Sequence, residues 1–249
     1  MTPLLTARGL QKRWRQGWWR PVETVGLAGL DLELFPGEVV GLIGESGSGK
    51  TTLARAALGL CPLDAGTVNL RGVDPHTQRS QVPPLAQLLF QDAGASLNPG
   101  LTVQAILEES KRHFPGSEPV EAVLDRLDLR SRAGARPREL SGGERRRVTL
   151  GQVWLADPTL LLADEPTAGL DASRKGEIID LLLSRHSPER CFLLISHDLP
   201  LVLYACRRLL VMQAGRIIDD FPTTELFSPQ RHPWTQKLCI NAGLEPPCS

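Results

Sequence analysis

The segment "EVVGLIGESGSGKTTLARAALGL", residues 38–60, contains an apolar run, a glycine-rich loop and a helical stretch in direct succession. Residues 38–44 have the length and apolar content of a buried strand. Residues 51–60 have a helical pattern that stops near Gly59. The loop between them, residues 44–51, fits G-x-x-x-x-G-K-[ST], a pattern that binds phosphate when a strand precedes it and a helix follows. The segment therefore predicts an α/β fold with a nucleoside triphosphate site.

The residue types of this loop explain its chemistry. Glycines at positions 44, 47 and 49 let the backbone curl, so that successive N–H groups face the phosphates. Lys50 can place a positive charge on the β- and γ-phosphates, and the Thr51 hydroxyl can bind Mg²⁺. The predicted nucleotide-binding set of this segment is Gly44, Glu45, Ser46, Gly47, Ser48, Gly49, Lys50, Thr51 and Thr52.

A second segment, "TLLLADEPTAGLD" at residues 159–171, predicts another buried strand that ends in two acidic residues. Asp164 would stand at the carboxyl edge of the sheet, where Mg²⁺ is expected. Glu165 points in a different direction and can act as the general base that activates water. An isolated Asp-Glu pair more often caps a loop, but behind a phosphate-binding loop we favour the catalytic interpretation.

Two further polar residues follow predicted strands. His197 ends the segment "CFLLISH" and would be aimed at the same crevice, where it could sense the γ-phosphate. A lone histidine is more often structural, and the sensor role rests on the presence of the other motifs. Gln91 ends the strand "LAQLLF" and could touch Mg²⁺ or water, although alone it would be a solvated loop residue.

The segment "LSGGE", residues 140–144, is a second glycine-rich helix start, with free N–H groups that suit an anion. The same residues also predict an ordinary helix cap, in which Ser141 and Glu144 form a capping box. Both interpretations can hold together. The arginine run at residues 145–147 splays around a helix, so we expect a solvated face rather than a nucleic-acid site.

The order of "GESGSGKT", Gln91, "LSGGE", "LLLADEP", "AGLD" and "ISHD" resembles the ATP-binding-cassette (ABC) ATPases over nearly the whole chain. The resemblance implies ATP hydrolysis, with Lys50, Glu165 and His197 as catalytic residues. It implies a Mg²⁺ ion bound by Thr51, Gln91 and Asp164. An aromatic residue after the first strand stacks on adenine in similar cassettes, and Trp14 is the candidate here; core packing or an exposed loop is the alternative.

The resemblance also implies an architecture. The expected RecA-like core, with an antiparallel β subdomain, comprises residues 1–91 and 157–230. Residues 92–156 would form a helical subdomain that contains the signature motif, and residues 231–249 a short C-terminal tail. The helical pattern predicts the elements of that subdomain: residues 102–113, residues 119–129 and the helix after Ser141.

The resemblance explains why one chain has two phosphate-binding helix starts. In such cassettes the Ser-Gly-Gly start, here Ser141, Gly142 and Gly143, closes on the γ-phosphate bound by a second cassette. Two chains then form a head-to-tail dimer with ATP at the interface. ATP that contacts both chains stabilises the dimer, and hydrolysis releases it.

Residues 90–103 and 225–238 are similar to the ATPase subunits of peptide, opine-metallophore and nickel importers. This similarity implies a non-identical second ATPase, two permease subunits and an extracytoplasmic solute-binding protein. It implies a peripheral position on the cytoplasmic face of the cell membrane. The alternative is an ATPase component of a soluble phosphonate-degrading complex of the carbon–phosphorus lyase type.

The composition of the chain bears on nucleic-acid binding, membrane insertion and the role of its cysteines. Lys plus Arg equals Asp plus Glu at 28 each, which gives no indication of nucleic acid. The apolar runs are too short to cross a membrane, and the amino terminus lacks the apolar core of a signal peptide, so we expect a soluble chain. The five cysteines are scattered without a metal or disulfide spacing, and they are expected to be mostly core residues.

Overall fold

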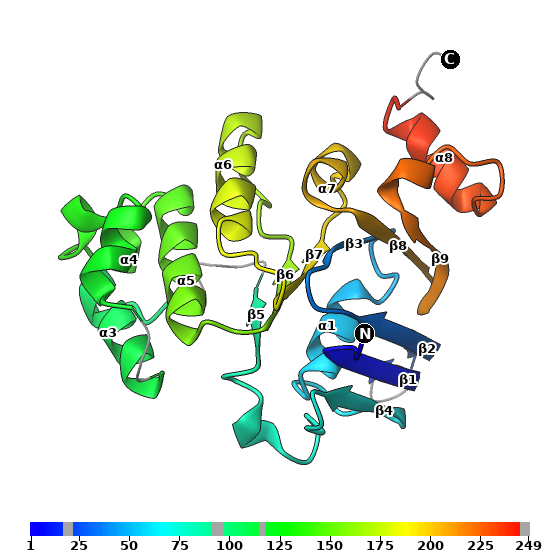
Figure 1. Ribbon diagram of the computed structural model, residues 1–249, viewed down its shortest axis with the longest axis horizontal. Coiled ribbons are helices and arrows are strands. Elements are labelled where there is room, and N and C mark those ends of the chain that lie inside the picture. Colours follow the sequence, from blue (N-terminus) through cyan, green and yellow to red (C-terminus); the bar gives the residue numbers. More distant parts are fainter. Residues whose placement is uncertain (17–21, 91–96, 115–117, 245–249) are drawn as a thin grey trace.

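The computed structural model describes residues 1–16, 22–90, 97–114 and 118–244 (Figure 1). The strands of the described residues form two β-sheets. The smaller sheet is antiparallel, with strand order β2-β1-β4: β1 Leu5–Gln16, β2 Val22–Leu34 and β4 Ala65–Leu70. The larger sheet has the order β5-β6-β7-β3-β8-β9: β3 Val39–Gly44, β5 Ala86–Leu89, β6 Leu160–Asp164, β7 Cys191–Ile195, β8 Arg208–Gln213 and β9 Arg216–Pro222.

The larger sheet is parallel from β5 to β8, and β9 joins it antiparallel to β8. Strands β3, β6 and β7, which the apolar runs predicted, lie together in its centre. Their carboxyl ends share one edge, so the segments that follow Gly44, Asp164 and Ile195 converge there. The predicted α/β fold class is confirmed.

The central strands are buried on both faces, because two apolar cores flank the sheet. In β6, Leu160 and Leu162 belong to one core, and Leu161 and Ala163 belong to the other. This alternation follows from the period of two in a strand, and burial on both faces explains the unbroken apolar sequence.

Helices cover both faces of the sheet. Helix α1, Lys50–Ala57, lies between the large sheet and the antiparallel sheet, and it buries Leu53 and three alanines. On the other face lie α6 and α7, and α3, α4 and α5 pack on one another as a group of helices beside the β5 edge of the sheet (Figure 1). The remaining bounds are α3 Val103–His113, α4 Val120–Arg126, α5 Gly142–Ala156, α6 Ala172–Leu183, α7 Leu199–Ala205 and α8 Pro233–Asn241, with 3₁₀ turns at Arg79–Gln81, Arg130–Arg132, Pro137–Glu139 and Thr223–Glu225.

The helices predicted at residues 102–113 and 119–129 and after Ser141 correspond to α3, α4 and α5. Helix α4 is shorter than predicted, since it ends at Arg126 and the backbone turns at Asp128, where φ is 53°. The division of the chain into subdomains at residues 91, 156 and 230 stays a prediction.

Four cysteines, Cys61, Cys191, Cys206 and Cys239, are buried free thiols, as expected of core residues. Cys248 lies outside the described residues. Within the described ranges, no helix has both the length and the apolar character needed to cross a bilayer.

Candidate nucleotide site

A cavity of about 440 Å³ lies at the carboxyl edge of the large sheet. Residues of the β3–α1 loop, of the ends of β6 and β7, and of β1 and β2 line this cavity. Most of the predicted site residues line it: Trp14, Gly44, Ser46, Gly47, Gly49, Lys50, Thr51, Thr52, Asp164, Glu165 and His197. Segments that are far apart in the sequence therefore form one site.

The glycines of the phosphate-binding loop have the backbone conformations that the pattern requires. Gly47 has φ 79° and Gly49 has φ 107°, both in the left-handed region that favours glycine. A Cβ atom on Gly49 would lie 2.1 Å from the carbonyl oxygen of Gly26, so no side chain fits at this position. The loop is thus fixed by its packing against β2 as well as by its own turns.

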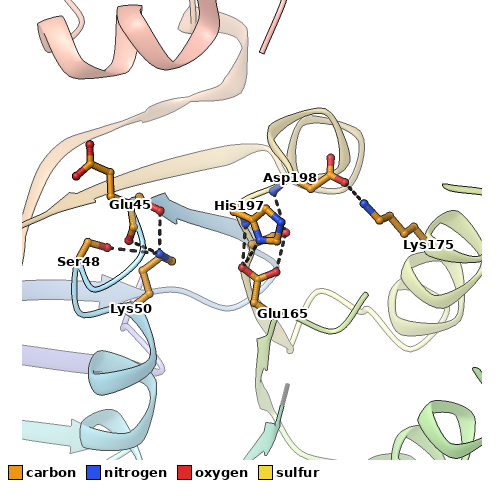
Figure 2. A network of polar contacts seen from close by, with 9 residues as sticks. Glu45, Ser48, Lys50, Glu165, Lys175, His197 and Asp198 are labelled. Atoms are coloured by element: carbon orange, nitrogen blue, oxygen red, sulfur yellow. Dashed lines mark hydrogen bonds and ion pairs between the residues drawn. The ribbon is translucent and has the colours of Figure 1, made fainter. Parts of the chain in front are cut away.

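The Lys50 ammonium group is folded onto this loop (Figure 2). Its Nζ donates to the carbonyl oxygens of Gly44 and Glu45, each at 2.8 Å, and lies 3.5 Å from the Ser48 hydroxyl. Burial lowers the pKa of Lys50, and the negative charges of Glu165 and Asp164 oppose that effect. A partly buried cation whose nearest partners are neutral oxygens suits an anionic ligand.

Asp164 is the last residue of β6 and is only 4 % exposed. Burial raises the pKa of its carboxyl group, and a hydrogen bond from Thr51 opposes the rise. A hydroxyl and a carboxylate are hard oxygen donors, which fit Mg²⁺. No three His, Cys, Asp or Glu side chains gather as a metal site within the described ranges, so an ion here would take further oxygens from the nucleotide. Gln91, the third predicted ligand, lies outside the described residues.

Glu165 has a left-handed backbone, with φ 49°, which is uncommon for a residue other than glycine. Its Oε1 atom lies 2.7 Å from Nδ1 of His197 and accepts a hydrogen bond from the His197 backbone at 3.1 Å (Figure 2). Among the residues that the structure describes, the Oε2 atom has one longer contact, at 3.4 Å, with the Ser196 hydroxyl. The predicted base and the predicted sensor therefore touch, and the histidine fixes one carboxylate oxygen.

Trp14 lies on β1 opposite Thr24 of β2, and its side chain is 38 % exposed at the rim of the cavity. The Lys12 ammonium group lies 4.9 Å from the ring centroid. A Cβ atom on Gly26 would come within 2.9 Å of the indole Nε1, so this glycine makes room for Trp14. An exposed aromatic ring at this rim can stack on a base.

Sequence reasoning missed part of the lining, namely Thr24, Val25 and Gly26 of β2. Gly26 carried the one available signal, because a glycine inside a strand pattern often marks a close approach. Glu45 and Ser48 belong to the loop without lining the cavity.

The second helix start lies elsewhere. Ser141 caps α5: its hydroxyl accepts from the Glu144 backbone at 3.2 Å, and Glu144 accepts from the Ser141 backbone at 2.7 Å, which confirms the predicted capping box. Arg132 donates to Glu144 at 2.8 Å. The Ser141 backbone N–H is the main reason why the pKa of Glu144 is lowered.

Ser141 and Gly143 line a separate cavity of about 500 Å³, and Gly142 is exposed beside them. The two cavities have no described lining residue in common. In one chain, therefore, the two glycine-rich helix starts do not serve the same site.

The solvated face predicted for the arginine run is wrong. Arg146 is buried and donates to the carbonyl oxygen of Ala168 at 2.9 Å. Arg145 donates to the carbonyl oxygen of Leu140 at 2.7 Å, while Arg147 pairs with acidic side chains. The reason is that α5 packs against other helices and loops, so Arg145 and Arg146 bind backbone carbonyl oxygens there.

Comparisons with known proteins identify the family of this chain. The sequence matches the family described as "ABC transporter" over residues 27–168, more than half of the chain. It is 36 % identical to a Brucella ovis protein named as a peptide import ATP-binding protein, covering 95 % of this chain and 76 % of the relative. A Brucella melitensis protein with the same kind of name is also 36 % identical, with the same coverage.

Solved structures show the same fold. The ATP-binding cassette MJ0796, described as a dimer bound to ADP and Pi, has a TM-score of 0.77 at 22 % identity and covers 88 % of this chain and 98 % of its own. The cbiO1 protein of Clostridium perfringens, part of the ABC transporter complex cbiONQ, has a TM-score of 0.76 at 24 % identity, covering 97 % and 96 %. The chain belongs to the ABC transporter family and is one of its ATP-binding cassette ATPases.

Proposed function

We propose that this chain binds Mg·ATP in the 440 Å³ cavity and hydrolyses it as the ATPase subunit of a peptide importer. One observation carries the proposal: Lys50, Asp164 and the Glu165–His197 pair converge at the carboxyl edge of the sheet. Among the importer classes that the sequence resembles, the names of the relatives favour peptides over nickel or metallophores.

Lys50 and the backbone N–H groups of its loop would bind the phosphates, and Trp14 would stack on the adenine. Thr51 and Asp164, together with Gln91, would hold Mg²⁺, which neutralises charge on the phosphates when bound. Burial lowers the pKa of Lys50 and raises the pKa of Asp164, so it disfavours the charged form of each side chain. The phosphates would offset this cost for Lys50, and Mg²⁺ would offset it for Asp164, because each supplies an opposite charge.

Glu165 would accept a proton from the attacking water as the general base. His197 holds the Oε1 atom of Glu165, which leaves Oε2 for the water, since its one contact within the described part of the chain is the long one to Ser196. His197 is largely exposed, with 74 % of its side chain accessible, so it can also reach the γ-phosphate.

The separate position of Ser141, Gly142 and Gly143 supports a head-to-tail dimer, in which they close on ATP bound by a second, non-identical ATPase. The dimer described for the structural neighbour MJ0796 supports a pairing of two cassettes. Two permease subunits and an extracytoplasmic solute-binding protein would complete an importer, with this chain on the cytoplasmic face of the membrane. The names of the relatives and the cbiONQ complex support that assembly.

Calorimetry of Lys50→Ala tests the nucleotide site. The variant should lose tight Mg·ATP binding, because the backbone alone leaves the phosphate charge poorly compensated. Lys237→Ala, at an exposed lysine of α8, is the matched control and should bind as the wild type does. Equal affinity for wild type and Lys50→Ala would refute the assignment.

A further inference from the structure

Helix α8 contacts the phosphate-binding loop through a hydrogen bond. The indole Nε1 of Trp234 donates to Oε1 of Glu45 at 2.9 Å, across 189 residues of sequence. The Glu45 carboxylate points away from Lys50, whereas the Glu45 backbone carbonyl accepts from the Lys50 ammonium group (Figure 2). Glu45 is therefore connected to Lys50 through its backbone and to α8 through its side chain.

The start of α8 is held firmly against the large sheet. Asp219 of β9 accepts from Arg231 at 3.2 Å, from the backbone N–H of His232 at 2.8 Å and from the Thr235 hydroxyl at 2.9 Å. The Asp219 side chain is 11 % exposed and Thr235 is fully buried. Trp234 stands between His232 and Thr235, so these bonds fix the place from which its indole reaches the loop.

We propose that Trp234 is a positioning residue for the nucleotide, because its N–H group keeps the Glu45 carboxylate turned away from the triphosphate. Glu45 is the second residue of a loop whose task is to bind anions. Without Trp234, the carboxylate is free to rotate toward Lys50, where it would compete with the phosphates for the ammonium group and repel them. Helix α8 thereby sets the affinity of the loop for ATP, an inference that rests on the proposed nucleotide site.

Trp234→Phe tests this role, because it keeps an aromatic ring and removes the N–H group. The dissociation constant for Mg·ATP, measured by calorimetry, should rise roughly tenfold, the size expected for a lost hydrogen bond to a charged group. Glu45→Gln keeps an acceptor and removes the charge. In the Glu45→Gln background, Trp234→Phe should therefore change the dissociation constant by no more than about twofold.

Trp154→Phe is the matched control. Trp154 is buried in α5, away from the cavity, and its Nε1 has no hydrogen-bond partner among the described residues. This variant should bind Mg·ATP as the wild type does. Asp219→Asn is a second test, since it weakens the hydrogen bonds that hold the start of α8 and does not change the loop. It should raise the dissociation constant for Mg·ATP, as Trp234→Phe does.

The outcomes separate the two proposals. A wild-type chain that does not bind Mg·ATP refutes the nucleotide site itself. A wild type that binds, with an unchanged affinity in a folded Trp234→Phe variant, overturns the role of Trp234. Equal losses in the wild-type and Glu45→Gln backgrounds also overturn it, because they would show that the ring only supports the packing of α8. If Trp234→Phe does not fold, an unchanged affinity in Asp219→Asn decides against the role.

Discussion

Asp164 is a charged residue of the site that is only 4 % exposed. Its pKa is raised, chiefly by burial, above the ordinary value of 3.8. A carboxyl group with a higher pKa in the folded chain binds its proton more tightly there than in the unfolded chain. The ionised form of Asp164 therefore lowers folding stability at neutral pH. This cost disappears as the pH falls through the raised pKa toward the ordinary value.

Asp164→Asn should accordingly raise the melting temperature of the nucleotide-free protein at pH 7, by about 2–4 °C for each kcal/mol of burial cost removed. The same change should abolish the further stabilisation that Mg²⁺ adds in the presence of ATP, because the carboxylate ligand is lost. Thermal melts with and without Mg·ATP measure both effects.

Asp171→Asn is the control, since Asp171 is exposed, its pKa is lowered chiefly by the Ser173 hydroxyl, and asparagine also caps helices well. This variant should show no rise in melting temperature. A lower melting temperature for nucleotide-free Asp164→Asn would contradict the electrostatic interpretation of Asp164.

Residues at the end of a strand, or a few residues beyond it, could be placed from the sequence. Lys50, Asp164 and His197 each lie within a few residues of a recognisable apolar run, and the parallel sheet brings those ends together. Gly26 and Trp234 were not assigned to the site, because their contacts join segments that no local pattern relates.

At the scale of elements, helix α5 could be predicted from the sequence, but the residues that pack against it could not. The capping box at Ser141 is local and was predicted correctly. The burial of Arg146 depends on the loop after β6, whose position relative to α5 is a matter of tertiary packing. Helix α8 is similar, since its place is set by Asp219 of β9.

Arg146→Ala should lower the free energy of unfolding by about 1–3 kcal/mol, because it removes a buried donor and leaves the carbonyl oxygen of Ala168 without that hydrogen bond. Urea denaturation measures the change. Arg174→Ala is the matched control: its guanidinium forms an exposed pair with Asp171, and such pairs contribute about 1 kcal/mol or less. Equal, small effects for both variants would show that Arg146 behaves as a surface residue.

At the scale of the whole molecule, the two glycine-rich helix starts line separate cavities. In the proposed head-to-tail dimer, the Ser-Gly-Gly start of each chain would close on ATP bound by the other. Glu165→Gln tests whether ATP connects the loop of one chain to the Ser-Gly-Gly start of the other. The change keeps the size of the side chain and removes the base, so hydrolysis should fall by roughly 10²- to 10⁴-fold while ATP binding persists. ATP would then remain between two subunits and hold the dimer closed.

Adding Ser141→Arg to the Glu165→Gln chain should prevent that closed state. The arginine would occupy the space that the neighbour's γ-phosphate needs, whereas this chain's own loop, in a different cavity, should keep its ATP affinity. Retention of ATP by the full complex after gel filtration measures closure of the composite site, and nucleotide titration measures binding. The full complex is needed because the natural neighbour can be a different subunit. If Ser141→Arg removed nucleotide only from its own chain's loop, both helix starts would serve one site, and the dimer would have to be abandoned.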